Sequence, residues 1–172
     1  VAIAGVGSLQ INGDGSYEFV PAANYNGAVP VATYTTNTGS TDSLTISINP
    51  INDPTITAPD TGNTDEDTTL TVNAANGVLS NDSDADDVLS VSTFTIAGVA
   101  GVHTAGSTVA IAGVGSLQIN GDGSYEFVPA ANYNGAVPVA TYTTNTGSSD
   151  NLTISINPIN DPTITAPDTG NT

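Results

Sequence analysis

Apolar and polar residues alternate along much of the chain, and this pattern predicts short β-strands rather than helices. The clearest case is residues 152–157, where Leu152, Ile154 and Ile156 point to one side and the polar residues between them point to the other. No segment has helical periodicity beyond a single turn at 73–76. Further strands are expected at 55–57, 69–72, 89–96, 116–119, 124–127 and 137–144.

One turn between two of these strands is specified strongly. Residues 120–123 have the sequence Asn-Gly-Asp-Gly and lie between the strands expected at 116–119 and 124–127. Asp-Gly tolerates positive φ, so a β-hairpin is expected here. About seven short strands with turns between them predict an all-β fold, a two-sheet sandwich of the immunoglobulin type.

The chain contains a long internal repeat. Residues 1–64 recur as 109–172, an offset of 108 residues. About 100 residues can enclose their own core, so each repeat is expected to be a domain rather than a solenoid unit. The sequence therefore predicts a tandem array of near-identical domains. The two copies differ only at Thr41/Ser149 and Ser43/Asn151.

The domain boundaries follow from two Asn-Asp-Pro segments, one repeat apart. Turn residues followed by proline favour a junction between domains. We therefore expect a complete domain at 52–160, the C-terminal part of a preceding repeat at 1–51, and the first strand of a following repeat at 161–172. Residues 1–51 alone would expose strand edges and half a core, so we expect them not to fold in isolation.

The charge of the chain is entirely negative. Among 172 residues there are no Lys or Arg and 17 Asp and Glu, for a net charge of −17. This balance disfavours binding to nucleic acid or to anionic membranes. With no Cys, there are no disulfides or thiolate metal sites. Counter-ions must come from solution, and no apolar run is long enough to insert into a membrane.

Two acidic runs stand out, residues 65–67 and residues 82–87. Such close carboxylates repel one another unless a cation lies among them. Calcium takes six to eight oxygen ligands in flexible geometry, and alternate Asp residues on a loop suit it. The other reading is a solvated acidic loop, but the absence of any basic residue favours calcium. The residues of these runs are Asp65, Glu66, Asp67, Asp82, Asp84, Asp86 and Asp87.

The second run does not form an EF-hand. Position 6 of that loop would be Asp87 instead of Gly, and position 12 would be Thr93 instead of Glu.

Several segments instead resemble cadherin domains. The sequence Asp-Ala-Asp at 84–86 resembles the D-A-D calcium motif of cadherins, and Asn52 with Asp53 resembles the Asn-Asp part of their inter-domain linker. More of the chain is similar to bacterial cadherin-like domains. The similar segments are 65–68, 79–84, 123–125, 129–135 and 141–143.

This resemblance implies a function. Such domains recur in giant RTX-type biofilm and ice-binding adhesins, which are type I secreted to the bacterial cell surface. There, near-identical extender repeats hold an adhesive tip away from the cell, and calcium at the junctions stiffens the array. The partners are then neighbouring repeats of the same chain, and other regions bind the adhesive target.

The resemblance also implies a set of calcium ligands. Asp84 and Asp86 match the D-A-D ligands, and Glu66 matches the glutamate that cadherins place early in the domain. The cadherin L-D-R-E motif has no counterpart, because the chain has no Arg. The linker ligands are Asn52, Asp53, Asn160 and Asp161, which join the seven residues of the acidic runs as candidate calcium ligands.

Catalysis is not expected. The sole histidine, His103, has no cysteine or second histidine to act with, and we interpret it as an exposed or turn residue. Glu18 and Glu126 lie within hairpin strands and are expected to face solvent. The large aromatic residues are expected in the core: Phe94, Tyr125, Phe127 and Tyr142.

A binding module is the alternative function. Threonines on expected strands, such as those at 55, 57, 141 and 143, could present rows of hydroxyls to ice or glycans. An extender must be long and uniform, whereas an adhesive tip occurs once or a few times. The near-identity of adjacent repeats therefore favours the extender.

Overall fold

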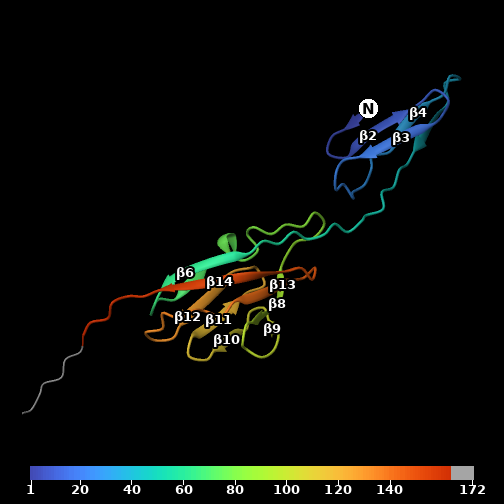
Figure 1. Cartoon of the computed structure of the whole chain (residues 1–172). Helices are drawn as coiled ribbons and strands as arrows, with labels where there is room; N and C mark the ends of the chain where they lie inside the picture. Colours follow the sequence, from blue (N-terminus) through green and yellow to red (C-terminus); the bar gives the residue numbers. More distant parts are fainter. Residues whose placement is uncertain (164–172) are drawn as a thin grey trace, which may run out of the picture. The chain divides into compact units, whose positions relative to one another are not determined.

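The computed structural model describes residues 1–163 and divides the chain into two compact units, Val1–Pro54 and Thr55–Thr172 (Figure 1). The division falls at the first Asn-Asp-Pro segment. Assignment of 1–51 and 161–172 to neighbouring repeats stays a prediction, and most of the latter lies outside the described residues. Within residues 1–163, no helix is long and apolar enough to cross a membrane.

The second unit is a sandwich of two sheets, which confirms the all-β immunoglobulin-like fold. All strand pairs are antiparallel except β14 with β6, which are parallel. The five-stranded sheet has the order β6 (Asp60–Asp65), β14 (Ser149–Asn157), β13 (Ala140–Thr144), β8 (Val91–Ile96) and β9 (His103–Thr104). The four-stranded sheet has the order β10 (Thr108–Ile111), β11 (Gly115–Ile119), β12 (Tyr125–Pro129) and β7 (Leu70–Val72).

The hairpin between β11 and β12 forms as expected. The backbone N–H of Asn120 donates to the carbonyl oxygen of Ser124 at 2.8 Å. Gly123 has φ of 85°, a left-handed conformation that glycine adopts without steric cost. The turn pairs Ile119 with Tyr125 and thereby sets which side chains of both strands face inward.

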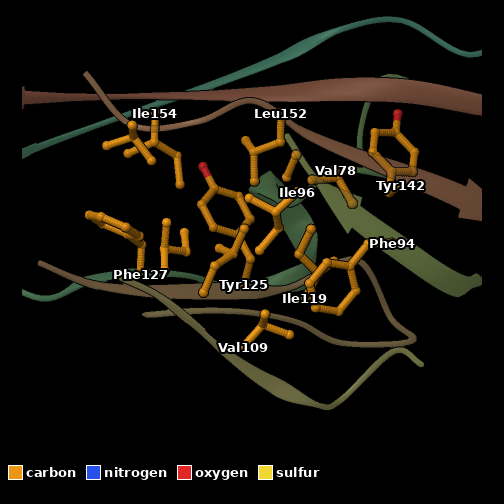
Figure 2. Close-up of a cluster of buried hydrophobic side chains, with 14 of the residues drawn as sticks. Val78, Phe94, Ile96, Val109, Ile119, Tyr125, Phe127, Tyr142, Leu152 and Ile154 are labelled. Atoms are coloured by element: carbon orange, nitrogen blue, oxygen red, sulfur yellow. The ribbon is translucent and has the colours of Figure 1, made fainter. Parts of the chain in front are cut away.

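The core lies between the two sheets (Figure 2). Tyr125 and Phe127 of β12 point toward Leu152 and Ile154 of β14. The prediction of core aromatics is confirmed, because Phe94, Tyr125, Phe127 and Tyr142 are all buried. Glu18 and Glu126 are exposed, as expected.

Three strands were not predicted from the sequence: β6, β9 and β10. The sequence of β6 is Asp-Thr-Gly-Asn-Thr-Asp, which contains no apolar side chain and therefore no alternation. Its Gly62 lies against the ring of Tyr125, where an added Cβ would approach the hydroxyl to 2.8 Å. The strand expected at 55–57 is only an isolated bridge between Ile56 and Ser83, and the expected single turn is the 3₁₀ helix η1 (Ala74–Asn76).

The first unit consists of two small sheets. One has the order β1 (Ala2–Ile3), β2 (Gly7–Ile11) and β3 (Tyr17–Pro21), and the other pairs β4 (Ala32–Thr35) with β5 (Thr41–Leu44).

Candidate metal centre

The acidic runs lie at opposite ends of β6. This strand runs parallel to β14, with Asp60 beside Leu152 and Asp65 beside Asn157. We call residues 55–58 with the loop 82–87 the entry end, because the Ile56–Ser83 bridge joins them just before β6. Residues 65–67 with 157–161 form the exit end. The length of β6 separates the two ends by about 17 Å.

Asp82 fixes the acidic loop of the entry end to the sandwich. Its Oδ1 accepts a hydrogen bond from the backbone N–H of Ala58 at 2.9 Å. Its Oδ2 accepts one from the hydroxyl of Tyr142 at 2.8 Å. Because one partner precedes β6 and the other belongs to β13, Asp82 holds a fixed position relative to the core.

Asp84 organises the rest of the same loop. Its Oδ2 accepts a hydrogen bond of 2.5 Å from the hydroxyl of Thr55, and its Oδ1 accepts bonds of 2.9 Å from the backbone N–H groups of Asp86 and Asp87. The hydrogen bond from Thr55, followed by these two backbone bonds, holds the pKa of the Asp84 carboxyl below its usual value. Asp84 therefore carries a full negative charge at neutral pH.

Asp60 is an acidic residue of the entry region that sequence reasoning missed. Its Oδ2 is buried and has no hydrogen-bond partner among the described residues. Burial raises the pKa of Asp60 to about 6, and the charges of Asp82 and Asp150 raise it further, while hydrogen bonding from Tyr142 opposes the rise. Neither Asp60 nor Asp150 belongs to an acidic run, so no sequence signal marks them.

Glu66 is the central residue of the exit end. Only 4% of its surface is exposed. Its Oε1 accepts a short hydrogen bond from the backbone N–H of Ile159, and its Oε2 accepts one from the side-chain amide of Asn134 at 3.2 Å. Asn160 and Asp161 follow Ile159 directly, so Glu66 binds the chain where it leaves the domain.

The two residues beside Glu66 are also held by hydrogen bonds. Asp65 accepts a bond of 3.0 Å from the side-chain amide of Asn157. Asp67 has φ of 61°, and its Oδ1 accepts a bond of 2.8 Å from the backbone N–H of Asn132. Asn132 and Asn134 both belong to the segment 129–135, so this loop orders the exit end.

The structure thus distributes the candidate ligands between two ends instead of gathering them. Within residues 1–163, no group of three or more Asp, Glu, His or Cys side chains is arranged to hold a metal ion. Asn52 and Asp53 belong to the first unit, where the side-chain amide of Asn52 donates to the carbonyl oxygen of Asp53 at 3.2 Å. Asn160 makes the equivalent bond to Asp161 at 3.4 Å.

The chemistry of the donors at both ends suits calcium. Every candidate side chain supplies carboxylate or amide oxygen, which calcium and magnesium prefer to nitrogen or sulfur. The chain has no Lys or Arg to neutralise these carboxylates. A fit to calcium would require oxygens of one domain end to be completed by those of another segment, because neither end alone has enough.

His103 does not form part of either end. It lies on β9, partly buried, with its ring centroid 5.5 Å from that of Phe94. Its interpretation as an exposed or turn residue is therefore wrong, because pairing of β9 with β8 places it on a strand against an aromatic ring.

The threonine rows are largely satisfied within the domain. The hydroxyl of Thr141 donates to Asn151 Oδ1 at 2.8 Å, and that of Thr143 shares a hydrogen bond with the Ser149 hydroxyl at 2.9 Å. Thr57 donates to the carbonyl oxygen of Ser149 at 3.3 Å. These bonds give the hydroxyls a structural role and do not favour a surface built for ice or glycans.

Comparison with known proteins gives one family. The bacterial cadherin-like domain family matches residues 52–158, which is more than half of the chain. The match contains both acidic runs and ends just before Asn160 and Asp161. No curated protein matches the chain significantly.

Proposed function

Because the chain belongs to the family of bacterial cadherin-like domains, we propose that residues 52–160 are a calcium-rigidified extender module of a bacterial cell-surface adhesin. Domains of this family generally bind calcium and are typically non-enzymatic. In this proposal the repeats are extracellular and follow the type I secretion route of RTX adhesins. They hold an adhesive region away from the cell, and that region binds the target.

The observation that carries the proposal is the hydrogen bond from Ile159 to the buried carboxylate of Glu66. It ties an acidic group to the last residue before the linker Asn160-Asp161. The other acidic group, the loop 82–87, lies at the end where the chain enters the domain. In a tandem array the exit end of one repeat and the entry end of the next would meet at each junction.

Calcium would supply, at such a junction, a positive charge that many oxygens can share. From the repeat that ends there, Glu66 with Asn160 and Asp161 would contribute. From the repeat that begins there, the counterparts of Asp84 and Asp86 would contribute. Asp65, Asp67, Asp82 and Asp87 are the remaining acidic candidates. For the complete domain described here, Asn52 and Asp53 are the linker residues on the entry side.

The linker itself contributes to stiffness. Pro54 and Pro162 follow the Asn-Asp pairs, and the proline ring fixes φ near −65° and so removes one rotation from each junction. Without calcium the converging carboxylates repel one another and the domains reorient, which is the default for neighbouring domains with a small interface. Calcium binding would thus convert a jointed chain into a stiff spacer.

Calorimetry on the whole chain tests the proposal. Excess chelator should lower the melting temperature of the second unit, and calcium should restore it, because an ion that binds only the folded state stabilises that state by mass action. Magnesium should restore it poorly, since it requires strict octahedral geometry and keeps its waters. An unchanged melting curve in chelator would remove the proposal.

A matched pair of variants locates the effect. Asp84→Asn and Asp122→Asn each remove one carboxylate that accepts hydrogen bonds from its own loop. Asp122 lies in the β11–β12 turn, outside both acidic ends. Asp84→Asn should weaken calcium-dependent stabilisation, whereas Asp122→Asn should leave it unchanged.

A further inference from the structure

The same sequence occurs in this chain in two states of burial. The strands β2 and β3 pair in the register of β11 and β12, with Leu9 beside Phe19 where Leu117 lies beside Phe127. Their inward side chains differ in exposure. Ile11 is 40% exposed and Tyr17 is 55% exposed, whereas their counterparts Ile119 and Tyr125 are 0% and 3% exposed; Tyr34 is 40% exposed and Tyr142 is 0%.

In the second unit this surface is covered by strands from residues 60–96. Strand β7 pairs with β12, β8 pairs with β13, and β6 pairs with β14. The first unit has the counterparts of β12, β13 and β14, namely β3, β4 and β5. The structure itself therefore shows which sequence covers this face.

The uncovered face of the first unit is apolar and hollowed. One cavity of about 430 Å³ is lined by residues that include Val1, Ile3, Leu9 and Ile11. A second, of about 210 Å³, is lined by Ile11, Tyr17, Tyr34 and Leu44 among others. Contiguous apolar surface of this kind marks an interaction site on a soluble domain. We call this face the acceptor face.

We propose that the acceptor face of residues 1–51 binds a segment with the sequence of residues 60–96, supplied by another copy of the repeat. The chain's own residues 60–96 are already paired with β12, β13 and β14. The acceptor face is preserved by the repeat, because its two differences lie at Thr41 and Ser43, whose counterparts Ser149 and Asn151 are exposed. Near-identical repeats can therefore complete one another by strand exchange, a recognised failure of such arrays.

The register of the complex follows from the second unit. There Tyr125, Glu126 and Phe127 pair with Val72, Thr71 and Leu70. The incoming segment should therefore place its Thr71 beside Glu18. Both Glu126 and Thr71 are exposed in the second unit, so this pair can be replaced without changing the core.

Cysteine cross-linking tests this register, because the chain has no cysteine of its own. The full chain carrying Glu18→Cys is mixed, in a thiol redox buffer, with a peptide of residues 55–108 carrying Thr71→Cys. Cα atoms of paired antiparallel residues lie about 4.5–5.5 Å apart, within the range a disulfide accepts. A mixed disulfide should form at a 1:1 ratio and saturate with added peptide.

Two controls make the result specific. The same peptide carrying Ser92→Cys instead should cross-link at least tenfold less, since Ser92 lies on β8 in the opposite sheet. The full chain carrying Glu126→Cys should also cross-link at least tenfold less with the Thr71→Cys peptide, because its own β7 already occupies that position.

Three results would overturn the proposal. The first is the absence of a saturable complex between chain and peptide. The second is equal cross-linking of the Thr71→Cys and Ser92→Cys peptides, which indicates adhesion without register. The third is self-association of the chain, measured by sedimentation, that added peptide does not reverse; the acceptor face would then be a surface between intact copies.

Discussion

The hydroxyl of Tyr142, on a ring that is fully buried in the core, donates a 2.8 Å hydrogen bond to Asp82. The bond connects the hydrophobic core to the acidic loop. Burial and this hydrogen bond both raise the pKa of Tyr142 well above its usual value, so the hydroxyl remains a donor at all relevant pH values. The sandwich thus positions one carboxylate of the entry end independently of any ion.

Replacing Tyr142 by Phe should destabilise the second unit. Asp82 would lose its donor and keep its charge, and a hydrogen bond to a charged group contributes about 1.5–3 kcal/mol. Chemical denaturation measures the loss. Tyr34→Phe is a matched control, because Tyr34 occupies the same position in the repeat but is largely exposed. Equal effects of the two substitutions would show that the bond to Asp82 contributes nothing.

The raised pKa of Asp60 predicts a specific dependence of stability on pH. The pKa is about 6 in the folded protein and 3.8 as the ordinary value, so the folded state holds the proton more tightly. The contribution of this group to stability is therefore full below about pH 3.8 and is lost as pH rises through about 6. In chelator, Asp60→Asn should raise the melting temperature at pH 7 relative to wild type.

The same variant should reduce the fall in stability between pH 4 and 6. The control is Asp122→Asn. Hydrogen bonds from Ser124 hold the pKa of Asp122 below its usual value, so its contribution is present above pH 3.8 and is lost at lower pH. Asp122→Asn should therefore leave the slope between pH 4 and 6 as it is in wild type. An unchanged slope in Asp60→Asn would refute the assignment.

Asn134 should matter for the exit end. Its side chain donates to the buried Glu66, so Asn134→Ala would leave that carboxylate with one donor fewer. We expect a loss of about 1–3 kcal/mol in chelator, part of which calcium recovers. Asn26→Ala is the matched control, since Asn26 is the repeat counterpart of Asn134 in the first unit. Denaturation curves with and without calcium should separate the two variants.

The sequence predicted those strands that alternate and missed those that do not. In β12 and β14 every second residue is buried, and both strands were expected. In β6 the stabilisation comes from parallel pairing with β14 and from Gly62, which leaves room for the Tyr125 ring. These contacts link residues about 90 positions apart, so a local pattern cannot report them.

The candidate site shows the same division. Charge runs identified Asp65 to Asp67 and the loop 82–87, but their placement at opposite ends of β6 depends on the sheet topology. The burial of Glu66 against the backbone of Ile159 could not be read from its neighbours in sequence. Asp60 and Asp150 approach one another only through pairing of β6 with β14.

The central claim is that calcium stiffens the junction between repeats, and small-angle X-ray scattering from a protein of two consecutive 108-residue repeats tests it most directly. A sandwich with strands of up to about ten residues advances the array by roughly 40–50 Å per domain. In calcium we therefore expect a stiff rod with a maximum dimension of roughly 80–100 Å, and in chelator a flexible pair with a broad distance distribution.

Replacing Asp84 and Asp86 by Ala in the second repeat should produce the flexible distribution even in calcium. Asp122→Ala in the same repeat should behave as wild type, because Asp122 lies in a hairpin turn outside both acidic ends. Distance distributions of the wild-type pair that coincide in calcium and in chelator would contradict the account.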